Sequence, residues 1–294
     1  MSHQLNPCLT DDGSYTFFSE EFGQTFHSKY GAKAESTYKY AVPTLLAEKA
    51  SRGHLRLLDV CYGLGYNTAA ALSTIWQANS DCVVEVMALE LDRAVPIATI
   101  EHNLLADWEE PIPQLLAQLA QGEIIDLDRL KAQLIFGDAR QTIDRVREQK
   151  FQADAIFLDP FSPLSCPQLW TVEFIDRVAS CCAPDGRIAT YSCAAAVRTA
   201  MRKAGLQVAD SIPVGRKAPG TIASFNPEGL PPLSQQELEH LQTRAAIPYR
   251  DPTLSDSMAK ITIRRELEQD DCGWETTSQW KKRWRKAADI NHQQ

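Results

Sequence analysis

Short apolar runs alternate with stretches of helical spacing through the middle of the chain. The first run, LRLLDV at 55–60, opens into a glycine loop. Similar runs recur at 83–89, 132–138, 153–159, 186–192, 206–214 and 221–226. Helical apolar spacing lies between them at 68–78, 93–108, 139–149 and 169–183. Because strands that alternate with helices favour parallel pairing, the pattern predicts an α/β fold: a doubly wound parallel sheet with helices on both faces.

Two flanking segments lie outside this alternation. Residues 1–54 are rich in aromatics and include a helical stretch over 35–50, so we expect them to cap the mouth of the sheet. Residues 55–225 hold the alternating part. Residues 226–294 begin with the linker-like NPEGLPPLS and continue as polar, helical segments around a turn at 247–257, which predicts a helical C-terminal extension.

Composition limits the class of protein. The 294 residues are 44% hydrophobic and 23% charged, which is typical of globular proteins and excludes collagen-like and disordered chains. No apolar run approaches the roughly 18 residues of a membrane span, and the first dozen residues lack the apolar core of a signal peptide. We therefore expect a cytoplasmic protein with no membrane partner.

Neither the cysteines nor the histidines are spaced as metal ligands. Eight cysteines include no CxxC pair, and six histidines show no HxH or HExxH spacing, so free thiols and no metal site are expected. The net charge of −8 combines 15 basic and 26 acidic residues over 1–194 with 15 basic and 12 acidic over 195–294. This balance argues against a protein that coats nucleic acid non-specifically, but it leaves room for a local basic dock.

Acidic residues follow four of the predicted strands. Asp59, Glu90, Asp138 and Asp159 lie at the ends of the runs at 55–60, 83–89, 132–138 and 153–159. Any one of them alone would most simply cap a helix or sit in a solvated loop. Ligands of doubly wound sheets bind at the carboxyl ends of the strands, so four acids at corresponding ends indicate a ligand site.

The glycine loop at 59–67, DVCYGLGYN, departs from the GxGxxG fingerprint of dinucleotide-binding proteins. Cys61 stands where a first glycine would be, and Gly63 and Gly65 let the backbone approach a ligand closely. A cofactor without a pyrophosphate, such as S-adenosylmethionine, suits this loop better than NAD, which makes a nicotinamide dehydrogenase a distant alternative.

Three of the acids match the polar groups of S-adenosylmethionine. Asp59 is expected to meet the methionine ammonium, Glu90 the ribose hydroxyls and Asp138 the adenine amino group. Gly63 and Gly65 complete the predicted cofactor site.

The fourth acid begins a sharper motif, Asp159-Pro160-Phe161. It resembles the Asp/Asn-Pro-Pro-Tyr/Phe loop of amino-group methyltransferases, where the polar side chain accepts hydrogen bonds from the target amine and the aromatic ring stacks on a base. A proline-stiffened turn with a core phenylalanine is the alternative interpretation.

Six segments between about residues 12 and 225 form a recognisable set: YGAKAEST (30–37), DVCYGLGYN (59–67), FGDA (136–139), DAIFLDPFSPLSCPQLWT (154–171), GRIATYSCAAAVRTAMRKAGL (186–206) and GRK (215–217). Through these segments the chain resembles a known family, the methyltransferase domain of MnmC, the bacterial enzyme that completes the modification of wobble uridine in certain tRNAs. Cys61 and Pro160 each replace a glycine of the family pattern. No GxGxxG follows residue 226, so the FAD-dependent oxidase half of MnmC has no counterpart and FAD is not expected.

The resemblance implies a Rossmann-like class I methyltransferase that moves a methyl group from S-adenosylmethionine to the aminomethyl nitrogen of wobble uridine in tRNA. Asp159 would accept a hydrogen bond or proton from the amine, and Phe161 would stack on the uracil. Glu35, Pro160, Trp170 and Lys217 would contact the substrate, although Trp170 is equally consistent with a core residue. Another amine acceptor and a non-catalytic binding protein are the other two interpretations.

The C-terminal WKKRWRK (280–286) has no counterpart in the family pattern. Trp280 and Trp284 are spaced to share one helix face among five basic side chains. This segment would either dock on the tRNA backbone or pack on the domain through its two tryptophans.

Overall fold

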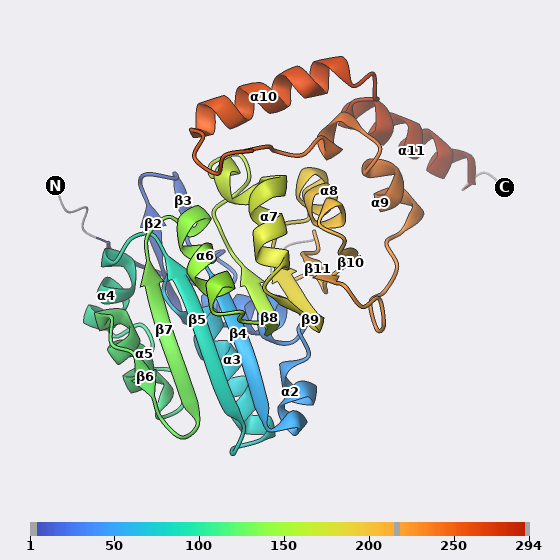
Figure 1. Cartoon of the computed structure of the whole chain (residues 1–294). Helices are drawn as coiled ribbons and strands as arrows, with labels where there is room; N and C mark the ends of the chain where they lie inside the picture. The colour runs from blue at the N-terminus through green and yellow to red at the C-terminus, as the bar shows by residue number, and fades with distance from the viewer. Residues whose placement is uncertain (1–4, 215–217, 292–294) are drawn as a thin grey trace.

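The computed structural model describes residues 5–214 and 218–291 (Figure 1). An eight-stranded sheet forms its centre, in the order β10-β11-β9-β8-β4-β5-β7-β6. The strands are β4 (His54–Val60), β5 (Val83–Glu90), β6 (Ile125–Asp126), β7 (Leu130–Phe136), β8 (Ala153–Leu158), β9 (Cys182–Thr190), β10 (Gln207–Asp210) and β11 (Thr221–Ser224). All seven predicted strands are present, and the short β6 is additional.

The five central strands are parallel, and the antiparallel pairs lie at the edges. β9, β8, β4, β5 and β7 pair in parallel, whereas β6 pairs antiparallel with β7 and β11 antiparallel with both β9 and β10. The chain runs from β4 outward through β5 to β7 and then returns to β8 on the other side of β4. The loops after β4 and β8 therefore diverge, which opens a crevice at this switch point.

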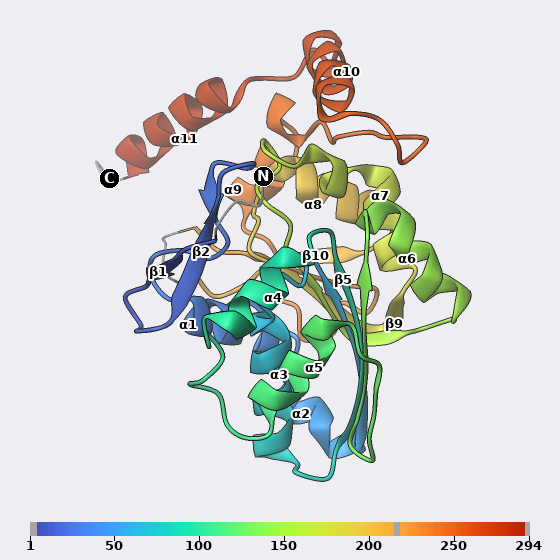
Figure 2. The ribbon, with the colours of Figure 1, turned by 90° about the vertical axis from the view of Figure 1, so that its left-hand side faces the viewer.

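Helices cover both faces of the sheet, as predicted (Figure 2). One face carries α3 (Tyr66–Ala78), α4 (Ala94–Glu101) and α5 (Ile112–Gln121), and the other carries α6 (Ala139–Glu148), α7 (Val172–Ala179) and α8 (Ala195–Lys203). Each face buries its own hydrophobic core. The predicted helix at 93–108 ends early, at Glu101, and α5 was not predicted.

The N-terminal segment lies over the carboxyl ends of the strands through β2 (Tyr15–Ser19) and β3 (Gln24–Thr25), whereas its last helices pack where β4 and β8 begin. It forms a small sheet of β1 (Pro7–Leu9), β2 and β3, followed by α1 (Ala32–Ser36), a π-helix η1 (Thr37–Ala41), α2 (Leu46–Lys49) and the short 3-10 helix η2 (Ala50–Arg52). The single helix predicted over 35–50 is thus broken. Pro43 cannot continue a helix and Leu45 adopts a left-handed φ of 60°, which ends one helix and starts the next.

The C-terminal extension is helical and packs on the domain. It contains α9 (Gln235–His240), the 3-10 helix η4 (Arg244–Ala246), α10 (Met258–Asp271) and α11 (Thr277–Asn291), while the 3-10 helix η3 (Pro167–Trp170) precedes α7. Tyr249 pairs with Thr171 in an isolated bridge and joins the core under α6–α8 with Leu254 and Ile261. The extension is therefore anchored to the same face as α6 and α7.

Both tryptophans of the C-terminal basic segment are engaged within the protein. The ring of Trp280 is buried and stacks on His240 with centroids 4.5 Å apart, and Trp284 Nε1 donates to Glu239 at 3.0 Å. The indoles thus pack on α9, whereas Lys281 and Lys282 are exposed.

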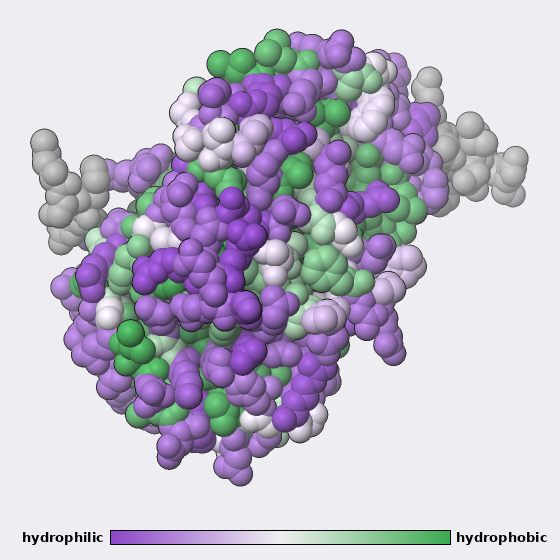
Figure 3. All heavy atoms as spheres, in the orientation of Figure 1, coloured by the Kyte–Doolittle hydropathy of each residue, from purple (hydrophilic) through white to green (hydrophobic). Residues whose placement is uncertain are grey.

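The surface is predominantly hydrophilic in the view of Figure 3, with hydrophobic side chains along the outer edge of α10, where Ile263 and Leu267 are exposed. None of the described helices combines the length and hydropathy that a bilayer crossing requires. Within residues 5–214 and 218–291, no cluster of three potential metal ligands occurs.

Candidate active site

A cavity of about 970 Å³ lies at the carboxyl ends of the central strands. Its floor comes from the loops after β4, β5, β7 and β8, and the segment from β2 to β3 forms the opposite wall. Predicted residues that line it are Glu35, Gly63, Glu90, Asp138, Asp159, Pro160 and Phe161. Its size lies at the upper end of the roughly 300–1,000 Å³ usual for small-molecule sites, and its acidic lining suits a cationic ligand.

The loop after β4 is shaped by three left-handed residues. Cys61, Gly63 and Gly65 have φ of 70°, 55° and 81°. A Cβ on Gly65 would collide with the ring of Tyr62, so glycine is required there. Gly65 is the N-cap of α3 and does not line the cavity, so its predicted role at the cofactor stays a prediction. Cys61 holds a left-handed conformation that costs a non-glycine residue about 1–2 kcal/mol.

Glu90 joins this loop to the end of β5. Its carboxylate accepts hydrogen bonds from the backbone N–H of Gly63 at 2.7 Å and of Asp92 at 2.9 Å. Burial raises the pKa of Glu90 in spite of these hydrogen bonds. The carboxylate therefore stands at the cavity edge in a fixed orientation, where it can accept from ribose hydroxyls.

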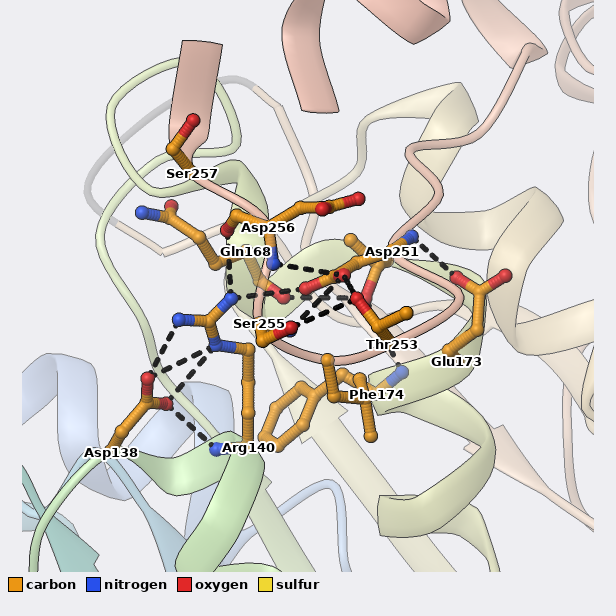
Figure 4. Close-up of polar contacts among 12 residues, drawn as sticks. Asp138, Arg140, Gln168, Glu173, Phe174, Asp251, Thr253, Ser255, Asp256 and Ser257 are labelled. Carbon is orange, nitrogen blue, oxygen red and sulfur yellow. Dashed lines mark hydrogen bonds and ion pairs between the residues drawn. The ribbon is translucent and has the colours of Figure 1, made fainter. Parts of the chain in front are cut away.

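Asp138 lies at the third strand end and caps α6. Oδ1 accepts from the backbone N–H of Arg140 at 2.9 Å, and the Arg140 side chain pairs with Oδ2 at 2.7 Å (Figure 4). Arg140 also lines the cavity. The predicted acid is thus held by a cation that the sequence pattern did not single out.

Asp59 lies beneath the glycine loop rather than in the cavity. The residue is fully buried, and its Oδ2 accepts from the Thr68 hydroxyl at 2.7 Å. Burial raises the pKa of Asp59 to about 8. Direct contact between Asp59 and the methionine ammonium stays a prediction. The buried position of Asp59 indicates that its side chain supports the glycine loop through Thr68.

Two buried acceptor atoms near this loop have no hydrogen-bond partner, Oδ1 of Asp59 and Oδ1 of Asn67. Asn67 lines the cavity, although its Oδ1 atom is itself buried and without a donor. The ammonium group of S-adenosylmethionine would supply a donor of the kind that this unsatisfied acceptor lacks.

Asp159 is held by two donors on the cavity floor. The Tyr40 hydroxyl donates to Oδ1, and Asn67 Nδ2 donates to Oδ2 at 2.8 Å. Desolvation, together with the nearby charge of Glu35, raises the pKa of Asp159 to about 7 in spite of these two bonds. A carboxyl group with that pKa can take up and release a proton near neutral pH.

Phe161 forms an aromatic cluster at the cavity wall with two residues from the N-terminal segment. Its ring stacks on Phe22 with centroids 4.3 Å apart and meets Phe26 edge-on at 5.0 Å. Trp170 is fully buried behind the loop and donates from Nε1 to the Phe161 carbonyl at 2.8 Å. The structure therefore places Trp170 in the core, not in the cavity wall, because its indole fills the space under α7.

Glu35 reaches the cavity from α1. It pairs with the buried Lys39 and accepts from the backbone N–H of Ser28 at 2.8 Å. Burial opposes the charge of Glu35, but Lys39, His27 and the hydrogen bond from Ser28 together outweigh it, so the pKa of Glu35 is lowered. Lys217, the remaining predicted substrate contact, lies outside the described residues.

These features define a class of protein. A Rossmann-like sheet with a glycine loop after the central strand and acids at the neighbouring strand ends is the architecture of an S-adenosylmethionine-dependent methyltransferase. A family model described as S-adenosyl-L-methionine-dependent methyltransferase matches residues 100–226. An uncharacterised protein of Methanocaldococcus jannaschii is 33% identical over 87% of this chain and 70% of its own length.

Two further similarities are to MnmC proteins. The crystal structure of MNMC2 from Aquifex aeolicus superposes with a TM-score of 0.79 at 32% identity, over 91% of this chain and 86% of that one. The bifunctional tRNA 5-methylaminomethyl-2-thiouridine biosynthesis protein MnmC of Aromatoleum aromaticum is 29% identical over 72% of this chain. The chain spans 33% of that protein's length. It belongs to the family of MnmC-related methyltransferases, and S-adenosylmethionine is its methyl donor.

Proposed function

We propose that the enzyme methylates the aminomethyl nitrogen of wobble uridine in tRNA. The proposal rests on two neighbouring side chains that line the cofactor cavity. One is Asp159, whose pKa is about 7, and the other is the aromatic ring of Phe161. An amine acceptor needs a group that takes its proton, and a nucleobase needs a ring on which to stack. The tRNA-directed name of the bifunctional relatives supports the same substrate.

S-adenosylmethionine, when bound, supplies a methyl group on a positively charged sulfur. The amine nitrogen must present its lone pair in line with that methyl group, so positioning supplies much of the rate enhancement. As the new C–N bond forms and the C–S bond breaks, the nitrogen becomes positive and must lose a proton. Asp159 accepts this proton, and Tyr40 and Asn67 hold its two oxygens in place.

The uracil base can stack on the face of the Phe161 ring that Phe22 covers only when the N-terminal segment moves. Phe22 covers one face of the Phe161 ring, and Gln24 Nε2 donates to the hydroxyls of Ser162 at 2.8 Å and Ser165 at 2.6 Å. The backbone N–H of Ser162 also donates to Gln24 Oε1 at 3.5 Å, and release of all three hydrogen bonds frees Gln24 of β3 from the loop after β8. The uracil can then replace Phe22 on the Phe161 ring after it leaves the anticodon stack.

Labelled methyl transfer with competing acceptors tests the proposal. The enzyme is incubated with methyl-labelled S-adenosylmethionine and tRNA from cells that cannot methylate the aminomethyl group, and matched tRNA without the aminomethyl group is the control. We expect label only in the first tRNA. Label in small amines or proteins but not in tRNA would identify another acceptor and contradict the proposal, as would cofactor binding with no labelled acceptor.

A further inference from the structure

The side chain of Asp138 is oriented almost entirely by Arg140. Arg140 Nε lies 3.2 Å from Oδ1 and 3.1 Å from Oδ2, and Nη2 lies 2.7 Å from Oδ2. With the backbone N–H of Arg140, three donors make four contacts with the carboxylate, because Nε–H is shared between both oxygens. The Asp138 side chain is 38% exposed, whereas that of Arg140 is 13% exposed.

The other end of the Arg140 guanidinium is held by the C-terminal extension. Nη1 donates to Asp251 Oδ2 and to the Asp256 carbonyl, both at 3.0 Å. Figure 4 shows Arg140 between Asp138 on one side and the turn from Asp251 to Asp256 on the other. The planar guanidinium therefore connects the two segments through a rigid set of donors.

Asp251 is a fixed point in this connection. Its side chain is fully buried, and Oδ1 accepts from the backbone N–H groups of Ser255 and Asp256, both at 3.2 Å. Its own backbone N–H donates to Glu173 at the start of α7 at 2.8 Å. Because backbone donors hold Oδ1, Oδ2 is directed at Arg140.

We propose that Asp251 of the C-terminal extension is a positioning residue for cofactor recognition, which acts through Arg140 to aim Asp138 at the adenine amino group. The proposal rests on the predicted adenine contact of Asp138 and not on the identity of the methyl acceptor. It makes the Asp251 side chain part of the support of the cofactor site, although Asp251 lies more than 100 residues after Asp138 in the sequence.

An asparagine at 251 cannot replace the carboxylate. Whichever way the amide is turned, its NH₂ group faces either the Arg140 guanidinium or the backbone N–H groups of the turn, and all of these are donors. In the first case Arg140 loses one anchor, and in the second the turn that places residue 251 loses two hydrogen bonds. Either change releases Asp138 from its fixed orientation.

This role is tested by the ratio of affinities for two ligands that differ only in the adenine amino group. Calorimetry compares S-adenosylhomocysteine with its analogue that lacks the exocyclic amino group, for the wild type, Asp251→Asn, Asp138→Asn and Asp256→Asn. Asp256→Asn is the matched control, because it alters a buried acid of the same turn whose carboxylate pairs with Lys260 and Arg264 instead of Arg140. A structural role alone would lower the melting temperature without changing the affinity ratio.

We expect the wild type and Asp256→Asn to prefer the amino-bearing ligand about tenfold, and Asp251→Asn and Asp138→Asn to show less than about threefold preference. Should Asp251→Asn not fold, Arg140→Lys tests the same link and should lose the preference too. A folded Asp251→Asn with the wild-type ratio overturns the proposal. If Asp138→Asn also keeps that ratio, the adenine contact itself is wrong, and methyl transfer to tRNA remains a separate question.

Discussion

Replacement of Asp159 by asparagine is the sharpest perturbation of the active site. Asparagine has nearly the same shape, but it cannot take the proton that the amine releases. General acid–base groups typically contribute 10²–10⁴-fold to rate, so we expect Asp159→Asn to lower kcat by at least about a hundredfold. Retention of more than about a tenth of the wild-type kcat would refute the proton-acceptor role.

The pKa of Asp159 also sets a pH profile. With a pKa of about 7, the fraction of the ionised form is about one tenth at pH 6 and nine tenths at pH 8, so kcat should rise nearly tenfold over this interval. An ordinary aspartate would be ionised throughout and would give no such rise. The acceptor amine also titrates. The pH dependence of kcat that remains in Asp159→Asn therefore measures the contribution of the amine.

Tyr40→Phe supplies a second control on the same profile. The Tyr40 hydroxyl donates to Asp159 and thereby lowers the pKa of the carboxyl group. Its removal should raise that pKa and move the midpoint of the kcat profile to higher pH. The assay is initial methyl transfer at saturating tRNA and cofactor between pH 5.5 and 9, and an unmoved midpoint would contradict this arrangement.

Stability measurements separate lost chemistry from lost folding. The pKa of Asp159 is raised on folding from 3.8 to about 7, so the folded state binds the proton more tightly than the unfolded chain. Its contribution to stability is therefore complete below about pH 4 and is lost as the pH rises through 7. Asp159→Asn should melt at or above the wild-type temperature at pH 8, since it removes a buried charge.

Further substitutions test the rest of the site and the C-terminal extension. Phe161→Ala should raise the KM for tRNA about tenfold or more without changing cofactor affinity. Phe161→Tyr keeps an aromatic ring and should have nearly the wild-type KM. Glu90→Gln places an NH₂ group near backbone donors and should weaken S-adenosylmethionine binding about tenfold, as measured by calorimetry. Trp280→Ala should lower the melting temperature, because its ring is buried on His240. The exposed pair Lys281→Ala/Lys282→Ala should leave that temperature unchanged and weaken the salt dependence of tRNA binding if α11 contacts the phosphates.

The local pattern of the sequence was sufficient to predict the strands and the acids at their ends. Strand periodicity and strand-end position are local properties, so Glu90, Asp138 and Asp159 were correctly expected at one edge of the sheet. The break near Leu45 was missed because helical spacing continues across Pro43. The indole of Trp170 follows the loop motif closely in sequence, yet it turns into the core, and sequence spacing does not show on which side of a loop a ring packs.

The partners that tune these acids come from distant segments. Tyr40 lies 119 residues from Asp159, and Asp251 lies 111 residues from Arg140. Neither has a local signature, because a tyrosine on a helix or an aspartate in a polar turn is usual in any protein. Asn67 had a weak signal as the last residue of the glycine loop, and its contact with Asp159 depends on the adjacency of β4 and β8 in the sheet.

The identity of the methylated atom tests the central claim most directly. tRNA that carries an unmethylated aminomethyl group is reacted with the enzyme and S-adenosylmethionine, digested to nucleosides and examined by mass spectrometry with fragmentation. The account predicts one added methyl group on the aminomethyl nitrogen of the wobble uridine, and its loss in Asp159→Asn. A methyl group on any other nucleoside, or an unmodified tRNA beside an enzyme that binds its cofactor, would contradict it.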